Sequence, residues 1–351
     1  MIDYLIVGSG IAGCCFSEFC LQNNKTFLVC DDNSQPSSKI AGGLYNPVVL
    51  KRFSEVWKAK EQLELAVPFY ASLEEKLKLK VDYKIPVYRK FTSVEEQNEW
   101  FTAADKPNLS SFLSTKLLSN IFPSVKSSYG YGEVLQTGYL DVKALVTNYA
   151  KYLENQQLFI SDRLDYNKIV FNTNHVVYNG IKYAHIIFAE GFGLHSNPFF
   201  NDLPLDGTKG ELLIIKSPNL KIDVTIKSSI FILPVGNDMY KVGATYDWSD
   251  KTNVPTENGK KELVEKLKEV INCDFDIVEH FAGVRPTVKD RRPLVGTHYH
   301  YKNLHILNGL GTRGVMLAPF LAKQLFEHIE TGKNLEKEID IIRFYKKRNL
   351  L

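Results

Sequence analysis

Three glycines near the start of the chain have a spacing that could bind the phosphates of a dinucleotide. Gly8, Gly10 and Gly13 form a G-x-G-x-x-G pattern directly after a short apolar run. In such a pattern the first glycine permits a tight turn, the second lets the backbone approach a pyrophosphate, and the third lets a helix pack closely on the strand. The helix that follows would offer free N–H groups and a positive dipole end to the phosphates, which makes Ile11 and Ala12 candidate ligands as well.

Two acidic residues follow the second expected strand. Residues 26–30 read as a buried strand that ends at Asp31, 18 residues after Gly13. This spacing suits a carboxylate that binds a ribose hydroxyl, and Asp32 is the neighbouring candidate. A carboxylate here would repel a 2′-phosphate, which disfavours NADP. The alternative is an ordinary glycine-rich turn beside a surface aspartate.

The hydrophobic pattern predicts the elements that must position these residues. Strand, glycine turn and helix recur at both ends of the chain, which predicts one discontinuous nucleotide-binding domain. The middle of the chain alternates as an antiparallel sheet does, which predicts a second domain. The expected fold class is α/β, a Rossmann-like domain plus an antiparallel β-sheet (α+β) domain. The expected strands are 4–7, 26–30, 169–171, 175–178, 185–188, 211–215, 230–234, 240–245 and 304–307, and the expected helices are 14–23, 55–80, 142–154, 259–271 and 315–329, with short helices and loops over 94–120.

Length and composition limit the class of protein. The chain has 351 residues, enough for two domains, and its net charge of +3 neither requires nor excludes a nucleic-acid partner. Its apolar runs are too short to cross a membrane, and the first strand begins too early to leave room for a signal peptide, so we expect a cytoplasmic protein. The five cysteines form no C-x-x-C pattern and no metal-ligand spacing, so no metal site is expected.

Five sequence blocks in a fixed order resemble the D-amino-acid oxidase superfamily of FAD-dependent oxidoreductases. This family includes glycine oxidase, sarcosine oxidase and the FAD domain of the bifunctional tRNA 5-methylaminomethyl-uridine enzyme. Asp31 departs from the glutamate that is usual in the family. The blocks are the glycine pattern with Asp31, residues 41–43, residues 210–213, residues 231–234 with 242–245, and residues 282–286 with Asp290, Pro293, Gly296 and 309–314.

The resemblance implies FAD as the cofactor and assigns parts of the chain to two domains. Residues 1–58, 139–207 and 284–351 would form the FAD-binding domain, and residues 59–138 and 208–283 the substrate-binding domain. The N–H groups of residues 311–314 would face the flavin, where the dipole of the last helix stabilises reduced flavin. The candidate cofactor-binding residues are Gly8, Gly10, Ile11, Ala12, Gly13, Asp31, Asp32, Ala41, Gly42, Gly43, Ala189, Gly191, Gly311, Thr312, Arg313, Gly314 and Val315.

The resemblance also indicates three candidate catalytic residues, Arg285, Arg313 and Tyr246. Arg285 stands where family members often bind the substrate carboxylate, and a planar guanidinium suits bidentate capture. The alternative is a structural arginine paired with Asp290. Arg313 either adds positive charge or holds substrate, and the alternative is that it only shapes its loop. Tyr246 either faces the substrate or packs, as does Tyr45. The covalent-flavin cysteine of sarcosine oxidases has no counterpart here, so we expect non-covalent FAD.

The resulting hypothesis is an oxidase of the C–N bond in a glycine-like or N-substituted amino acid, which yields an imine and uses oxygen as the acceptor. One alternative is a stand-alone tRNA-modifying oxidase that removes the carboxymethyl group from 5-carboxymethylaminomethyl-uridine. The basic clusters 289–292 and 346–348 could then bind tRNA phosphates, although ordinary solvated surface charge is the favoured interpretation of each. Another alternative is a flavin-binding protein without turnover. Oligomeric state is not encoded in these patterns.

Overall fold

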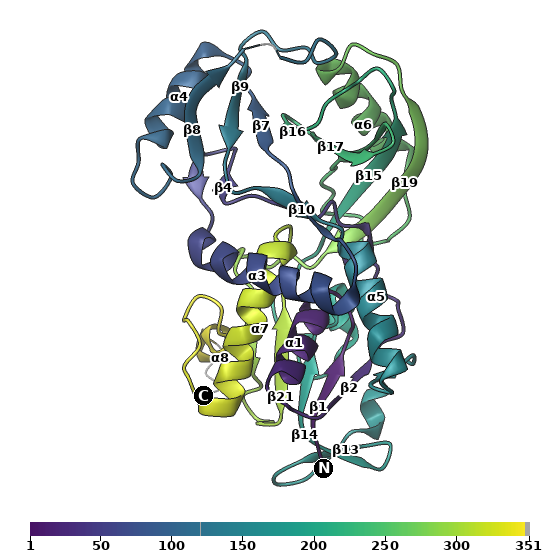
Figure 1. Ribbon diagram of the computed structural model, residues 1–351. Coiled ribbons are helices and arrows are strands. Elements are labelled where there is room, and N and C mark those ends of the chain that lie inside the picture. The colour runs from purple at the N-terminus through teal and green to yellow at the C-terminus, as the bar shows by residue number, and fades with distance from the viewer. Residues whose placement is uncertain (120, 348–351) are drawn as a thin grey trace.

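The computed structural model describes residues 1–119 and 121–347 and has two sheet-based parts, one above the other in Figure 1. The lower part is built on a largely parallel sheet. Its central strand β1 pairs in parallel with β2 and with β14, and β14 pairs in parallel with β21. The strands of this sheet are β1 Ile2–Val7, β2 Phe27–Cys30, β11 Phe159–Ile160, β12 Val170–Phe171, β13 Val176–Tyr178, β14 Ile181–Phe188, β20 Leu294–Thr297 and β21 Leu304–Asn308.

Both faces of this sheet are buried, as its sequence requires. Tyr4 and Ile6 of β1 join an apolar cluster with the helices on one face, whereas Leu5 and Val7 join a second cluster on the other face. Near-continuous apolar strands are typical of parallel sheets covered on both sides. The helices of this part are α1 Ile11–Gln22, α2 Ser37–Ile40, α3 Ala59–Leu77, α5 Val142–Asn155, α7 Gly314–Thr331 and α8 Ile342–Lys347, with the short 3₁₀ helices η1 Tyr166–Lys168 and η2 Gly191–Ser196.

The helix α3 packs on the lower part rather than on the upper sheet (Figure 1). The Tyr70 hydroxyl donates a 2.7 Å hydrogen bond to the Val315 carbonyl at the start of α7. Phe69 stacks on Phe19 of α1 with ring centroids 5.2 Å apart. The expected domain boundaries give α3 to the substrate-binding domain, whereas its contacts favour a boundary after the helix.

The upper part is an eight-stranded sheet in the order β19-β15-β18-β17-β16-β7-β9-β8. Its pairs are antiparallel except that β16 and β7 are parallel. The helix α6, Glu257–Val270, covers one face through Leu263 and Leu267. The strands are β7 Val87–Lys90, β8 Leu113–Leu118, β9 Tyr131–Val134, β15 Thr208–Lys216, β16 Thr225–Lys227, β17 Phe231–Gly236, β18 Met239–Gly243 and β19 Asp276–Arg285, and α4 Val94–Ala104 lies beside β8.

Short strands connect the two parts. A three-stranded sheet has the order β3-β10-β6, and β4 pairs with β5. Tyr45 is buried in this region, where its hydroxyl donates to Asp82 at 2.8 Å. The strands are β3 Leu44–Tyr45, β4 Val48–Val49, β5 Ser54–Glu55, β6 Asp82–Lys84 and β10 Gly138–Leu140.

The expected fold class is confirmed, a Rossmann-like part joined to an antiparallel-sheet part. The helix expected over 142–154 forms as α5, and the Asp141 side chain caps it by accepting a bond from the Ala144 N–H. The main difference lies within 94–120, where helices and loops were expected and residues 113–118 instead form β8. The sequence L-S-T-K-L-L lacks a strict alternation, and the strand forms because β9 pairs with it.

Candidate functional site

One large cavity, with a volume of about 1130 Å³, runs along both parts of the molecule. It exceeds the roughly 300–1,000 Å³ typical of a pocket for one small ligand, so it can hold a dinucleotide together with a substrate. All the candidate cofactor-binding and catalytic residues line it except Gly13. The lining candidates are Gly8, Gly10, Ile11, Ala12, Asp31, Asp32, Ala41, Gly42, Gly43, Ala189, Gly191, Tyr246, Arg285, Gly311, Thr312, Arg313, Gly314 and Val315.

The glycines of the fingerprint have distinct surroundings. A Cβ on Gly13 would lie 1.9 Å from the Gly8 carbonyl oxygen, so this glycine permits close packing of α1 and does not face the cavity. Gly8 has φ +102°, and a Cβ there would lie 2.5 Å from the Ala189 oxygen. A Cβ on Gly10 would meet only the Ser38 hydroxyl, at 3.0 Å. Gly10 therefore places no side chain between the start of α1 and the cavity, which fits a bound pyrophosphate, although the Ile11 N–H already donates to the Ser38 hydroxyl at 3.1 Å.

The acidic residues after β2 are held in place by backbone donors. The Asp31 carboxylate accepts hydrogen bonds from the Ser9 N–H at 2.5 Å, from the Ser9 hydroxyl and from the Asn33 N–H at 2.7 Å. Asp32 accepts from the Ser34 N–H at 2.9 Å and lies 3.9 Å from Arg163. Burial raises the pKa of Asp32, but these hydrogen bonds and Arg163 more than offset it, so the pKa is lowered overall.

Glu190 is a cavity residue that the sequence analysis missed. It follows β14, accepts a hydrogen bond from the Tyr166 hydroxyl at 2.5 Å and another from the Asn197 amide at 2.7 Å. Burial raises the pKa of this carboxyl to about 7. The sequence held a signal for this residue, because Glu190 stands between Ala189 and Gly191, directly after a buried strand. Ligands of parallel sheets bind at the carboxyl ends of the strands, so an acidic residue there is a candidate ligand-binding residue.

The segment of residues 41–43 presents bare backbone to the cavity. Gly43 has φ +78°, and a Cβ there would lie 2.0 Å from the Leu140 oxygen. A Cβ on Gly42 would lie 2.8 Å from the ring of Phe231 on β17. Both glycines therefore permit close packing of this segment against Leu140 and Phe231, and the segment lines the cavity without side chains at two of its three positions.

The N-terminus of α7 also faces the cavity. Two of the four N–H groups expected to donate there are already bonded, since Gly311 donates to the Pro286 oxygen at 3.0 Å and Arg313 to the Leu310 oxygen at 3.2 Å. The N–H groups of Thr312 and Gly314 have no such backbone partner in the described part of the chain. These two groups, together with the helix dipole, can stabilise negative charge in the cavity.

The structure brings the three candidate catalytic residues together. The Tyr246 ring lies 4.6 Å from the Arg285 guanidinium carbon, and it also contributes to the electrostatic surroundings of Arg313. Burial lowers the pKa of both arginines, and neither forms an ion pair within residues 1–119 and 121–347. Asp290 pairs with Arg343 at 3.0 Å, not with Arg285. Two buried cations therefore face the cavity without a carboxylate partner.

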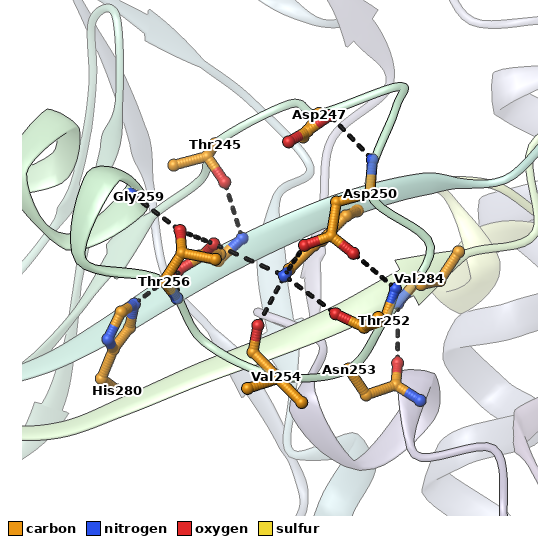
Figure 2. Close-up of polar contacts among 12 residues, drawn as sticks. Thr245, Asp247, Asp250, Thr252, Asn253, Val254, Thr256, Gly259, His280 and Val284 are labelled. Carbon is orange, nitrogen blue, oxygen red and sulfur yellow. Dashed lines mark hydrogen bonds and ion pairs between the residues drawn. The ribbon is translucent and has the colours of Figure 1, made fainter.

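The loop that carries Tyr246 is held by residues on the face of β15 that points away from the cavity. The buried Lys209 ammonium contacts the Asp250 carboxylate and the Val254 carbonyl, each at 2.5 Å (Figure 2). Glu211 accepts a 2.8 Å bond from the Thr256 hydroxyl. These contacts fix the loop at its far end, while the Tyr246 side chain stays 62% exposed.

The Tyr45 hydroxyl is already bonded, because it donates to Asp82 and accepts from Lys84 at 2.8 Å. These two bonds favour a packing role for Tyr45 over contact with a substrate.

The described residues contain no group of three or more His, Cys, Asp or Glu side chains that could hold a metal ion. Within the same residues, no helix combines the length and the apolar character needed to span a membrane.

Comparison with known proteins decides the family. The model of the family "DAO: FAD dependent oxidoreductase" matches residues 3–328. The chain belongs to this family. It is therefore a FAD-dependent oxidoreductase.

Curated relatives align with DAO-family segments of this chain. The tRNA 5-methylaminomethyl-2-thiouridine biosynthesis bifunctional protein MnmC of Legionella pneumophila is 23% identical over 222 residues, which cover 54% of this chain and 32% of that protein. Glycine oxidase of Bacillus subtilis is 27% identical over 142 residues, which cover 38% of each. The chain thus spans about a third of the length of these relatives.

Solved structures share the DAO-family fold over almost the whole chain. Glycine oxidase from Bacillus cereus has a TM-score of 0.75 at 20% identity and covers 95% of this chain and 96% of its own. L-proline dehydrogenase from P. horikoshii has a TM-score of 0.80 at 15% identity and covers 99% and 98%. At these identities the likeness concerns the fold alone.

Proposed function

We propose that this DAO-family protein oxidises the C–N bond of a glycine-like or N-substituted amino acid to an imine, with oxygen as the electron acceptor. The observation that carries the proposal is the Arg285 guanidinium, which is mostly buried, lines the cavity and forms no ion pair in the described part of the chain. Its bonds to the Lys209 and Thr245 carbonyls are long, at 3.3 and 3.4 Å. A substrate carboxylate would supply the missing counter-charge.

The residues of the cavity have separate roles in this proposal. Arg285 binds the carboxylate, and the Tyr246 ring restricts the guanidinium to that side of the cavity. FAD supplies the hydride acceptor, and the free N–H groups at the start of α7 stabilise the negative charge that reduction adds. Water then hydrolyses the imine to an oxo acid and an amine.

The FAD would be held without a covalent bond to the protein. Among the described cysteines, Cys30 is the one that lines the cavity, and it lies at the end of β2, beside the ribose-binding aspartates. Burial raises its pKa to about 12, so it is not a reactive thiolate. We also propose that the lower part, including α3, binds FAD and that the upper sheet binds the substrate.

The test is to mix the FAD-loaded protein anaerobically with sarcosine, glycine, D-alanine or L-proline and to measure the flavin absorbance over time. Bleaching at a rate that saturates with one of these amines is the expected result, and re-oxidation in air would establish oxygen as the acceptor. If no amine bleaches the flavin while dithionite does, the proposed activity is wrong.

A second candidate function is tRNA modification, in which the substrate group is a carboxymethylaminomethyl nucleoside. The specific observation is a basic and aromatic rim near Arg313. Arg291 lies 5.9 Å from the ring of Trp248, which is 46% exposed, and Arg292 lies 5.6 Å from the ring of Trp57. Exposed aromatic rings beside arginines can stack on unpaired bases. Of the other basic cluster, Arg348 lies outside the described residues.

Under-modified bulk tRNA distinguishes the two candidates. Bleaching of the flavin by this tRNA, and binding that weakens with salt and on Arg291→Ala with Arg292→Ala, would favour the tRNA candidate. Efficient turnover of a free amino acid, with tRNA binding unchanged in the double variant, would contradict it.

A further inference from the structure

Lys227 is a second cation on the cavity face of the upper sheet. It is the last residue of β16 and lines the cavity. The strand register places it opposite Phe231, and Phe231 opposite Gly243. Residues paired in this way share one face of a sheet. Leu212 continues the row on β15, and its side chain lies against Gly243.

The Lys227 side chain is mostly buried and has no carboxylate partner. It forms no ion pair within the described residues, and the ring of Phe231, 5.9 Å from the ammonium nitrogen, is its nearest aromatic contact. Burial, together with repulsion from the neighbouring Arg89 and Lys266, lowers its pKa to about 8. The nearby carboxylate of Glu96 is already bonded to Arg89 at 2.7 Å. An ammonium in such surroundings is expected to have an anion as its ligand.

Lys227 and Arg285 are too far apart to bind the same carboxylate. The Arg285 guanidinium lies against Gly210 on β15, where a Cβ would be 1.9 Å from it. From β15 to β16 there are three strand intervals, through β18 and β17. At about 4.8 Å for each interval, the backbones of β15 and β16 are roughly 14 Å apart. The side chains of Arg285 and Lys227 shorten the distance between the two charges by part of this separation. The two cations therefore fit two anionic groups on one elongated ligand.

We propose that Lys227 binds a distal anionic group of the substrate, so that the preferred amine is an N-substituted amino acid with a second carboxylate or a phosphate at the end of its N-substituent. The α-carboxylate would lie at Arg285 and the distal group at Lys227. The inference rests on the proposed function, because it takes Arg285 as the site of the α-carboxylate. Lys227 is a specificity-determining residue in this scheme and takes no part in the hydride transfer.

The first experiment compares matched pairs of N-substituted glycines. N-(5-carboxypentyl)glycine and N-hexylglycine differ in one terminal charge, and N-(5-phosphonopentyl)glycine distinguishes a phosphate ligand from a carboxylate. We expect kcat/KM for flavin reduction to be about 10- to 100-fold higher with a terminal anion, the range of one charge-assisted hydrogen bond. Equal values for the charged and neutral probes would overturn the inference and leave the proposed function intact.

Variants assign the preference to Lys227. In Lys227→Met the ratio of kcat/KM for the charged and neutral probes should fall toward one, and Lys227→Arg should restore most of it. Lys216→Met is the matched control, because Lys216 is an exposed lysine of β15 that does not line the cavity. A ratio unchanged in Lys227→Met would overturn the assignment.

A binding measurement covers the case in which no probe reduces the flavin. Suberate should perturb the flavin absorbance at about 10-fold lower concentration than octanoate, and this advantage should disappear in Lys227→Met. That result without turnover would retain the distal anion site and refute the proposed oxidation. Equal binding of suberate and octanoate would refute the site itself.

Discussion

The two walls of the cavity differ in whether a short sequence motif marks them. On the cofactor wall, Gly8, Gly10 and the start of α1 come from one segment of the chain. On the substrate wall, Arg285 and Lys227 come from β19 and β16, and the register of the upper sheet brings them onto one face. A short motif locates the start of the first wall, which residues 189–191 and 311–315 complete, whereas no motif marks the second wall, which depends on strand pairing.

The charges of the two walls also differ. The cofactor wall carries Asp31, Asp32 and Glu190, which suit hydroxyl groups of a nucleoside. The substrate wall carries Arg285 and Lys227, neither of which forms an ion pair within the described residues, beside the Arg89–Glu96 ion pair and the carboxylates of Glu95 and Glu99. A variant on one wall should therefore change the affinity for one ligand and leave that for the other nearly unchanged, which the following predictions test.

The largest effect is expected from Gly10→Val on the cofactor wall. The valine side chain would occupy the space that the pyrophosphate needs, while its only close neighbour in the protein is the movable Ser38 hydroxyl. We expect a folded protein that contains no FAD, measured by flavin absorbance beside far-ultraviolet circular dichroism. Normal FAD content in the purified variant would contradict the assignment of this wall.

Next in size is Arg285→Ala on the substrate wall. Loss of a charge-assisted pair should weaken carboxylate binding by about 2–4 kcal/mol, or roughly 30- to 1,000-fold, with FAD retained. The measurement is the amine concentration that half-saturates flavin reduction. Arg52→Ala is the control, since Arg52 is exposed and does not line the cavity. Loss of FAD with unchanged substrate affinity would show that the two walls are not separate.

A smaller effect concerns Glu190 and pH. Its pKa is about 7 in the folded protein against 4.5 for an ordinary glutamate, so the folded state holds the proton more tightly than the unfolded state. The stability from this group is present below pH 4.5 and is lost as the pH rises through 7. Glu190→Gln stays neutral, so its melting temperature should exceed that of the parent by about 1–3 °C at pH 8.

Thermal unfolding at pH 5 and pH 8 checks this prediction. The difference between Glu190→Gln and the parent should shrink at pH 5, where the parent carboxyl is largely protonated in the folded state. A difference of the same size at both pH values would show that the amide acts through packing and not through ionisation.

The smallest effect is expected from Tyr246→Leu. The ring of Tyr246 lies over Arg285 but is 62% exposed, so its cation–π contact should be worth about 0.5–1 kcal/mol. We expect a two- to fivefold rise in the half-saturating amine concentration and no change in FAD content. A loss of maximal rate larger than this loss of affinity would instead place the Tyr246 side chain at the reacting atoms.

The sequence predicts the cofactor wall better than the substrate wall. Gly8 and Gly10 could be found because their spacing with Gly13 lies within one short segment between an apolar run and a helix. Glu190 was missed because its importance depends on β14 lying beside β1. Lys227 was missed because nothing in its own segment shows that Phe231 and Gly243 extend a common face toward Arg285.

The order of strands in the lower sheet has a consequence for synthesis of the chain on the ribosome. The strand β21, residues 304–308, pairs with β14, which lies beside β1. At about 5–20 residues per second, roughly 6–25 seconds separate synthesis of β14 from that of β21. During this interval β13 pairs with residues 181–183 of β14, but residues 186–188 lack their partner strand, so this part of the apolar edge is open to association with other chains.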